Sequence, residues 1–111
     1  MPDYRDQEAT NQTIFREMNE WTAEARDGID VGPAHLDTYL CECSDGGCTS
    51  PIRLTHPEYE AIRADPVRFA IVVDHENPEL DLVRSENVRF ATVDKIYGPA
   101  MAIARASDPR R

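Results

Sequence analysis

The three cysteines of the chain, Cys41, Cys43 and Cys48, lie in the short segment YLCECSDGGCT. Cys41 and Cys43 are two residues apart in a segment that predicts the end of a β-strand, so their side chains should project from the same face. Residues 44–47 favour a turn, because glycine adopts a positive φ at no steric cost, and such a turn returns Cys48 toward the other two sulfurs. An odd number of cysteines argues against a disulfide framework, so the cluster predicts a bound metal.

A closed tetrahedral zinc site would need one imidazole beside these three thiolates. We favour His75 as that ligand, because it follows the β-prone run 68–73. Its parity is that of the large side chains of this run, so it should lie just past the end of an inner strand. Four other residues could supply the fourth ligand. His56 lies at a predicted helix start and His35 in a loop before the first strand, and Asp45 and Asp74 are acidic residues near Cys48 and His75.

Zinc is the predicted metal, and two other soft metal centres compete with it. Three cysteines and a histidine can also hold a [2Fe–2S] cluster, and the short cysteine spacing resembles the CDGSH type in outline. The chain departs from that pattern because no histidine follows Cys48 within a few residues. Copper(I) is the third option, since thiolates suit it as ligands.

The charge of the chain bears on its partners. The 111 residues include 12 basic and 21 acidic side chains, which gives a formal net charge of −9. Nucleic acids and anionic membranes attract basic surfaces, so we expect neither as a partner. We also expect a cytoplasmic protein, because no signal peptide or membrane-length apolar run is evident and a free thiol cluster fits a reducing compartment.

The pattern of elements predicts a single α+β domain. We expect an N-terminal amphipathic helix packed on a small, mostly antiparallel sheet, with a zinc knuckle and one or two further short helices. The domain should span residues 11–106, between a flexible N-terminus at 1–10 and a flexible C-terminus at 107–111. Strands are expected near 36–41, 51–54, 67–73, 80–85 and 88–96.

Three segments have helical patterns. In residues 11–26 apolar side chains recur at intervals of three and four, and we expect this stripe to pack on the sheet; its members are Ile14, Phe15, Met18, Trp21, Thr22 and Ala25. A second helix should run to about Ala64 from a capping box formed by Thr55 and Glu58. A short closing helix is expected at 100–106.

Three blocks of the chain resemble a family of small actinobacterial proteins: IFREMNEW, YLCECSDGGCTSPIRLTHPEYEAIRADPVRFAIVVDHENPEL and VDKI. The family pattern combines an N-terminal helix, F-x-C-E-C-x4-C, L-T-x-x-E-Y-E, R-x-x-P-x-R-F, a histidine after the next strand and a late V-x-K. The resemblance covers roughly residues 14–96. It implies that Cys41, Cys43, Cys48 and His75 occupy the ligand positions. Asp74 departs from the pattern, because relatives more often have glycine there. The family has no established activity, so the resemblance implies a site and no function.

The favoured function is that of a non-enzymatic zinc-binding domain, acting as a protein-interaction or regulatory adaptor for a protein partner. The chain contains no phosphate-binding glycine loop, no nucleophile elbow and no His-Glu-x-x-His motif. The expected contact surface surrounds the knuckle, since loops commonly carry function. Its residues are Glu42, Ser44, Asp45 and Thr49.

Two other functions remain open at this point. The first is a metal- or redox-responsive sensor, in which metal loss or thiol oxidation changes partner binding. The second is a zinc hydrolase-type enzyme with an open coordination position, although three thiolates make zinc a poor Lewis acid. Its general base would be one of the nearby carboxylates, Glu42, Asp45, Asp74 or Glu76.

Overall fold

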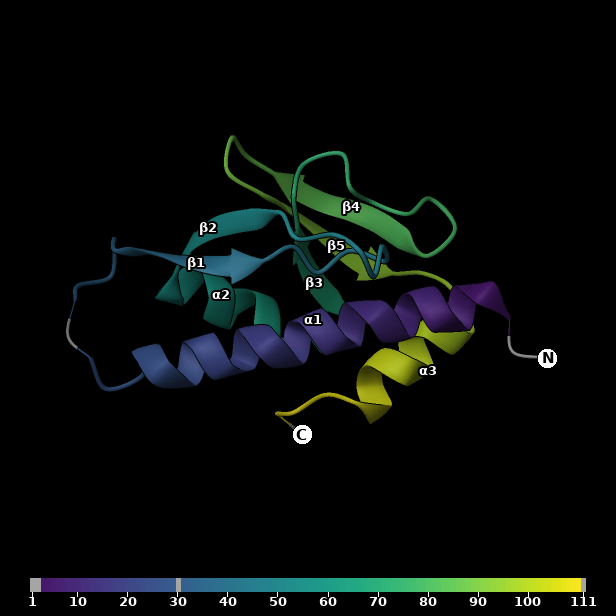
Figure 1. The fold of residues 1–111 in the computed structure, drawn as a ribbon, viewed down its shortest axis with the longest axis horizontal. Coiled ribbons are helices and arrows are strands. Elements are labelled where there is room, and N and C mark those ends of the chain that lie inside the picture. The colour runs from purple at the N-terminus through teal and green to yellow at the C-terminus, as the bar shows by residue number, and fades with distance from the viewer. Residues whose placement is uncertain (1–2, 30, 111) are drawn as a thin grey trace.

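The computed structural model describes residues 3–29 and 31–110 and has the predicted α+β architecture (Figure 1). Its elements in chain order are α1 (Tyr4–Arg26), β1 (Leu36–Leu40), β2 (Pro51–Thr55), α2 (His56–Arg63), β3 (Arg68–Ile71), β4 (Asp81–Glu86), β5 (Ala91–Lys95) and α3 (Gly98–Ala106). Within the described residues, no helix combines the length and the apolar character needed to cross a membrane.

The strands form two small antiparallel sheets instead of the single sheet that we expected. One contains β1 and β2, and the other has the order β3-β5-β4. The chain just beyond β1 connects them, because Cys41 N donates to Ser50 O and Glu42 N donates to Ala70 O of β3, at 3.1 and 2.8 Å. The cysteine segment therefore lies where the two sheets meet.

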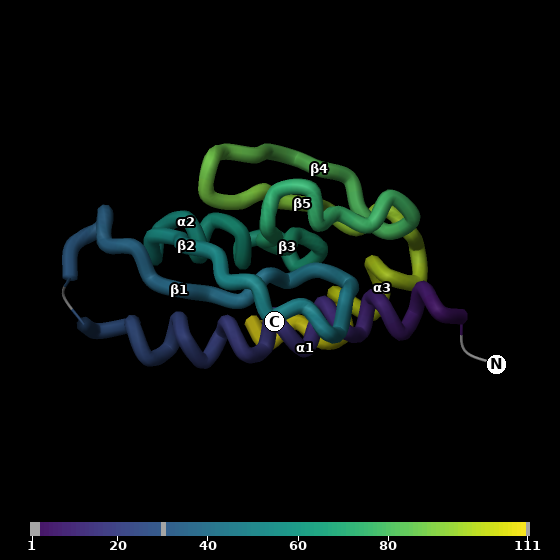
Figure 2. Tube along the Cα trace, turned by 45° about the horizontal axis from the view of Figure 1, so that its top comes forward, coloured from purple at the N-terminus to yellow at the C-terminus, as the bar shows by residue number. Residues whose placement is uncertain are grey.

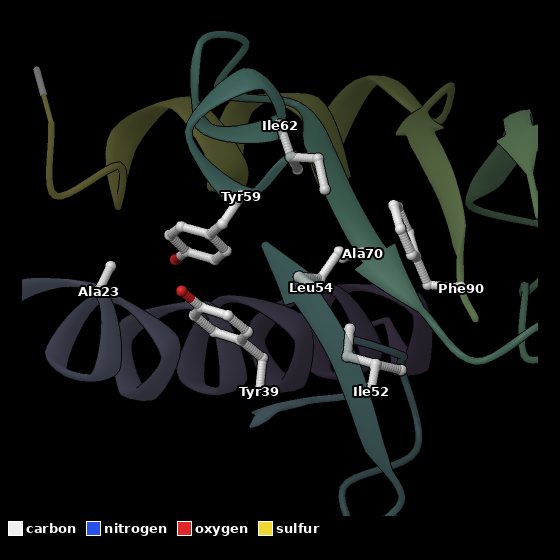
Figure 3. Close-up of a cluster of buried hydrophobic side chains, with 8 residues drawn as sticks. All are labelled: Ala23, Tyr39, Ile52, Leu54, Tyr59, Ile62, Ala70 and Phe90. Carbon is white, nitrogen blue, oxygen red and sulfur yellow. The ribbon is translucent and has the colours of Figure 1, made fainter. Parts of the chain in front are cut away.

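A core of buried side chains holds α1, α2 and both sheets together (Figure 3). The rings of Tyr39 and Tyr59 stack within it, with centroids 4.6 Å apart and planes 6° apart. The remaining members are Ala23, Ile52, Leu54, Ile62, Ala70 and Phe90.

The first helix begins at Tyr4, seven residues before the predicted start at Asn11. Asp3 caps it, because the carboxylate of Asp3 accepts a hydrogen bond from Arg5 N at 2.9 Å. Helix α1 thus takes in most of the segment for which we expected a flexible N-terminus. At the other end of the chain, the Arg110 side chain donates hydrogen bonds to Glu20 and Glu60, so ion pairs hold that end against α1 and α2.

The prediction that the apolar side chains of the first helix pack on the sheet is wrong. The side chains of Ile14, Met18 and Trp21 are 49%, 42% and 62% exposed to solvent. The buried face of α1 is instead largely polar. That face contains Ala9, Gln12, Arg16, Asn19, Glu20 and Ala23. These polar side chains form hydrogen bonds with backbone or side-chain groups of other parts of the chain, which makes their burial favourable. Arg16, for example, donates to Pro66 O and to Ala104 O of α3 at 2.7 and 2.8 Å.

The predicted capping box of α2 is confirmed. Glu58 N donates to Thr55 Oγ1 at 3.2 Å, and Thr55 N donates to Glu58 Oε1 at 2.8 Å. The box fixes where β2 ends and α2 begins. It thereby places Arg63, in the last turn of α2, beside the cysteine segment.

Candidate metal centre

The structure brings together the four predicted ligands, Cys41, Cys43, Cys48 and His75. One ligand atom from each lies within 4.8 Å of all the others. His75 Nδ1 is 3.5 Å from Cys41 Sγ and 3.8 Å from Cys48 Sγ. In a tetrahedral zinc site, bond lengths near 2.3 Å to sulfur and 2.0–2.1 Å to nitrogen separate ligand atoms by about 3.6–3.8 Å. The cluster therefore has the dimensions of a site for one metal ion.

The turn that returns Cys48 to the cluster depends on Asp45. Cys48 N donates to Asp45 O at 3.0 Å, and Gly47 N donates to Asp45 Oδ1 at 2.9 Å. Among the described glycines, positive φ occurs at Gly28 and Gly32 and not in this turn. Gly46 has a different reason to be glycine, because a Cβ there would lie 3.2 Å from the Asn11 side chain of α1.

His75 reaches the sulfurs through a turn and not through the parity of a strand. Strand β3 ends at Ile71, and His75 N donates to Val72 O at 3.0 Å to close the turn. Asp74 has a φ of 73°, in the left-handed region that glycine occupies without strain. The same turn lets Val72 N donate to Cys41 Sγ at 3.2 Å.

Glu42 is fully buried, so its predicted place on an exposed interaction surface is wrong. Side chains alternate along the extended segment 41–43, and Glu42 therefore points away from the two sulfurs that flank it. Its carboxylate accepts hydrogen bonds at 2.9 Å from three donors on different elements: Asn19 Nδ2, Arg63 Nη2 and Ala70 N. The other three surface candidates, Ser44, Asp45 and Thr49, are half-buried or exposed.

Sequence reasoning missed Asn19 and Arg63 as supports of the site. Asn19 binds both backbone groups of Leu40, donating to its O at 2.9 Å and accepting from its N at 2.8 Å, in addition to the bond with Glu42. Arg63 also donates to Arg68 O at 2.9 Å. The alternation of side chains along segment 41–43 could have indicated this role, because it places Glu42 on the face opposite Cys41 and Cys43.

Cys41 and Cys43 shift each other's pKa in opposite directions. A hydrogen bond from the Cys41 thiol lowers the pKa of Cys43 to about 5. The same hydrogen bond, together with burial, raises the pKa of Cys41. A lowered pKa at Cys43 favours the thiolate form that a metal requires, and metal binding would release the protons that remain on the other thiols.

The alternative fourth ligands lie outside the cluster. His35 Nε2 is 3.5 Å from Asp37, and His56 Nε2 is 3.1 Å from Glu60 one turn further along α2. Asp45 and Asp74 are close to the cluster but are not members of it. Together with Glu76 they line an open cavity of about 240 Å³ beside Cys43 and His75.

Comparisons with known proteins returned no match among family models, curated proteins or solved structures. The resemblance to the small actinobacterial family therefore stays a prediction. Function is therefore inferred from the geometry of the cluster of Cys41, Cys43, Cys48 and His75.

Proposed function

We propose that this chain is a non-enzymatic domain that binds one zinc ion through Cys41, Cys43, Cys48 and His75 and acts through contact with another protein, as an interaction or regulatory adaptor. The observation that carries the proposal is the mutual distance of at most 4.8 Å between the four ligand atoms. Four protein ligands complete a tetrahedron and leave no position for substrate or water, which is typical of structural zinc.

Zinc suits this donor set better than an iron–sulfur cluster. A two-iron cluster divides its ligands between two metal atoms, whereas here the four ligand atoms converge on one small volume. Three thiolates and one neutral imidazole bind Zn²⁺ in many structural sites. The hydrogen bond from Val72 N to Cys41 Sγ also favours the thiolate form that a metal requires.

The role of the metal would be to strengthen the contact between two segments that hydrogen bonds such as Glu42 N to Ala70 O already bring together. Cys41, Cys43 and Cys48 belong to the segment between β1 and β2, and His75 belongs to the loop between β3 and β4. A bound ion would hold the ends of the two sheets together and order the exposed turn around Asp45. In this proposal Ser44, Asp45 and Thr49 present polar groups to a partner at that turn.

A redox- or metal-responsive sensor is the second candidate, and one observation favours it. Cys41 and Cys43 are buried, but Cys48 is half-buried and His75 is exposed. An oxidant could therefore reach one sulfur of the site ahead of the others. An enzyme is the less favoured reading, because three thiolates reduce the Lewis acidity of zinc and His75 would take the fourth position in the proposed site.

Metal stoichiometry in matched histidine variants tests the proposal. The wild-type chain should contain one zinc by native and elemental mass spectrometry, and His75→Ala and Cys43→Ser should not retain it at one per chain. His35→Ala and His56→Ala are controls, since these histidines bind carboxylates elsewhere, and each should keep one zinc. Stoichiometric zinc in Cys43→Ser, an iron–sulfur absorption spectrum, or a water as the fourth ligand in X-ray absorption would each contradict it.

A further inference from the structure

The outer face of α1 carries three large apolar side chains that the fold does not cover. Ile14, Met18 and Trp21, here called the α1 stripe, are spaced by four and three residues and therefore line one face of the helix. They are 49%, 42% and 62% exposed. Figure 2 shows α1 along one side of the molecule, with β1, β2 and α2 on its inner side. Contiguous exposed apolar side chains of this kind mark interaction sites.

Helix α1 packs on the rest of the protein through a largely polar face and exposes apolar side chains, whereas most amphipathic helices bury their apolar face. Its inner face relies on hydrogen bonds, such as those of Arg16 to Pro66 O and of Asn19 to Leu40. Because the stripe faces the other way, its side chains add little to the folded core. Their size and spacing therefore call for an explanation outside the folding of this chain.

The charges beside the stripe indicate the chemistry of its partner. The exposed residues of α1 include two charged side chains, Glu17 and Glu24, and both are acidic. Glu17 lies between Ile14 and Trp21 on the helix surface, and Glu24 lies one turn beyond Trp21. Neither carboxylate forms an ion pair or a hydrogen bond with any other residue that the structure describes.

We infer that the α1 stripe docks an amphipathic helix of another protein, whose apolar side chains recur at three and four residues and whose Lys or Arg side chains flank that apolar face. The apolar side chains would pack on Ile14, Met18 and Trp21, and the basic ones would pair with Glu17 and Glu24. This inference rests on the proposed protein-contact function and names a second contact surface, on α1, with the class of partner that it accepts.

Charge argues against a second copy of this chain as the occupant. Two stripes packed together would bring four carboxylates, Glu17 and Glu24 from each copy, to one interface without an exposed base on α1 to pair with them. Each copy also has a net charge of −9, which opposes association. The same two carboxylates disfavour an anionic lipid surface.

Trp21 gives the experiment its signal, because it is the only tryptophan in the chain. The metal-loaded full chain is titrated with a tryptophan-free helical peptide that has leucine at i, i+3, i+4 and i+7 and lysine on both flanks. A control peptide keeps the leucines and replaces each lysine by glutamate. The expected result is a saturable blue shift of Trp21 emission with the basic peptide, and binding at least about tenfold weaker with the acidic one.

Matched variants locate the contact. Met18→Gln and Ile14→Gln should each weaken binding of the basic peptide by about tenfold, as loss of a central anchor does. Glu17→Gln combined with Glu24→Gln should weaken it and reduce its dependence on salt. Val88→Gln is the control, since Val88 is fully exposed on the turn between β4 and β5, and it should bind as the wild type does. All variants should keep the wild-type thermal midpoint.

Four results would overturn the inference: no saturable binding of the basic peptide, equal binding of both peptides, a concentration-dependent dimer in sedimentation, or a Trp21 shift with phosphatidylcholine vesicles and not with peptide. Zinc content is measured on the same samples. If the chain binds the peptide but contains no zinc, the metal proposal is contradicted and the docking inference stands. If the chain contains one zinc but does not bind the peptide, the metal proposal stands and the docking inference is contradicted.

Discussion

Arg63 donates a hydrogen bond from Nη2 to Glu42 Oε1 at 2.9 Å, and both side chains are buried, at 2% and 0% exposure. The guanidinium of Arg63 also lies 5.2 and 5.5 Å from the ring centroids of Tyr59 and Phe69. The pair thus connects the last turn of α2 to the residue between two candidate metal ligands. The Arg63–Glu42 ion pair therefore helps to hold the extended segment 41–43, and with it the sulfurs of Cys41 and Cys43, which project from the other face of this segment.

We expect Glu42→Gln to destabilise the protein and weaken metal binding, although Glu42 is not a ligand. The substitution keeps the size of the side chain but leaves Arg63 buried without its counter-charge, which costs about 3–5 kcal/mol. Urea denaturation at a fixed free-zinc concentration measures the free energy of unfolding, and competition with a chromophoric chelator measures affinity. Glu17→Gln, at an exposed position, is the control and should change stability by less than about 0.5 kcal/mol. A Glu42→Gln protein as stable as this control would contradict the role given to the pair.

Asp74→Gly should stabilise the zinc-bound protein. Asp74 has a φ of 73°, and a left-handed conformation costs a residue with a Cβ about 1–2 kcal/mol, offset in part by the greater flexibility of glycine in the unfolded chain. We expect a net gain of up to about 1 kcal/mol for glycine and a loss of about 1–2 kcal/mol for Asp74→Val. Chemical denaturation of both variants, with zinc content measured in parallel, checks the sign. The order of stability should be Gly, Asp, Val, and any order that places Val above Asp would show that the turn is not strained.

The fold and the ligand set were predictable where local patterns carry the information. The run from Tyr39 to Cys43 indicates a strand leading into a knuckle, and the capping box at Thr55 marks the start of α2. The position of His75 beside the sulfurs was also predicted, although through strand parity and not through the Val72–His75 turn that brings it there. A left-handed Asp74 is a backbone detail that hydrophobic patterns do not report.

The buried face of α1 and the burial of Glu42 could not be predicted from local patterns, because both depend on partners distant in the sequence. Hydropathy assigns Arg16 and Asn19 to solvent, yet their partners are backbone groups of residues 66 and 104 and of Leu40. Burial of such polar groups is favourable only when those partners are in place, and a periodicity argument contains no information about them.

If zinc binds as proposed, its removal should loosen segments 41–48 and 72–76 more than the tyrosine core. A chain of this size buries enough apolar surface for the stacked Tyr39 and Tyr59 to persist without metal, whereas segments 41–48 and 72–76 would lose the ion that joins them. We expect hydrogen exchange after chelation to speed up in these two segments first and in β1 and α2 much less, with a lower thermal midpoint. Restoration of protection by one equivalent of zinc is the control. Uniform deprotection of the whole chain would show instead that folding as a whole requires the metal.

Acid should weaken the contact that holds the end of α1 against β1, where Arg26 donates three hydrogen bonds to Asp37. These bonds lower the pKa of Asp37 below its ordinary value of 3.8. Because the folded pKa is the lower one, the stability from this carboxylate is fully present above pH 3.8 and is lost as the pH falls through the folded value. We expect Asp37→Asn to be less stable than the wild type near neutral pH, with a difference that shrinks to nearly zero at strongly acidic pH. Urea denaturation of both proteins, after a chelator has removed any bound metal, measures the difference in the free energy of unfolding across this pH range. A difference that stays constant as the pH falls would mean that Asp37 stabilises the fold through its shape and not through its charge.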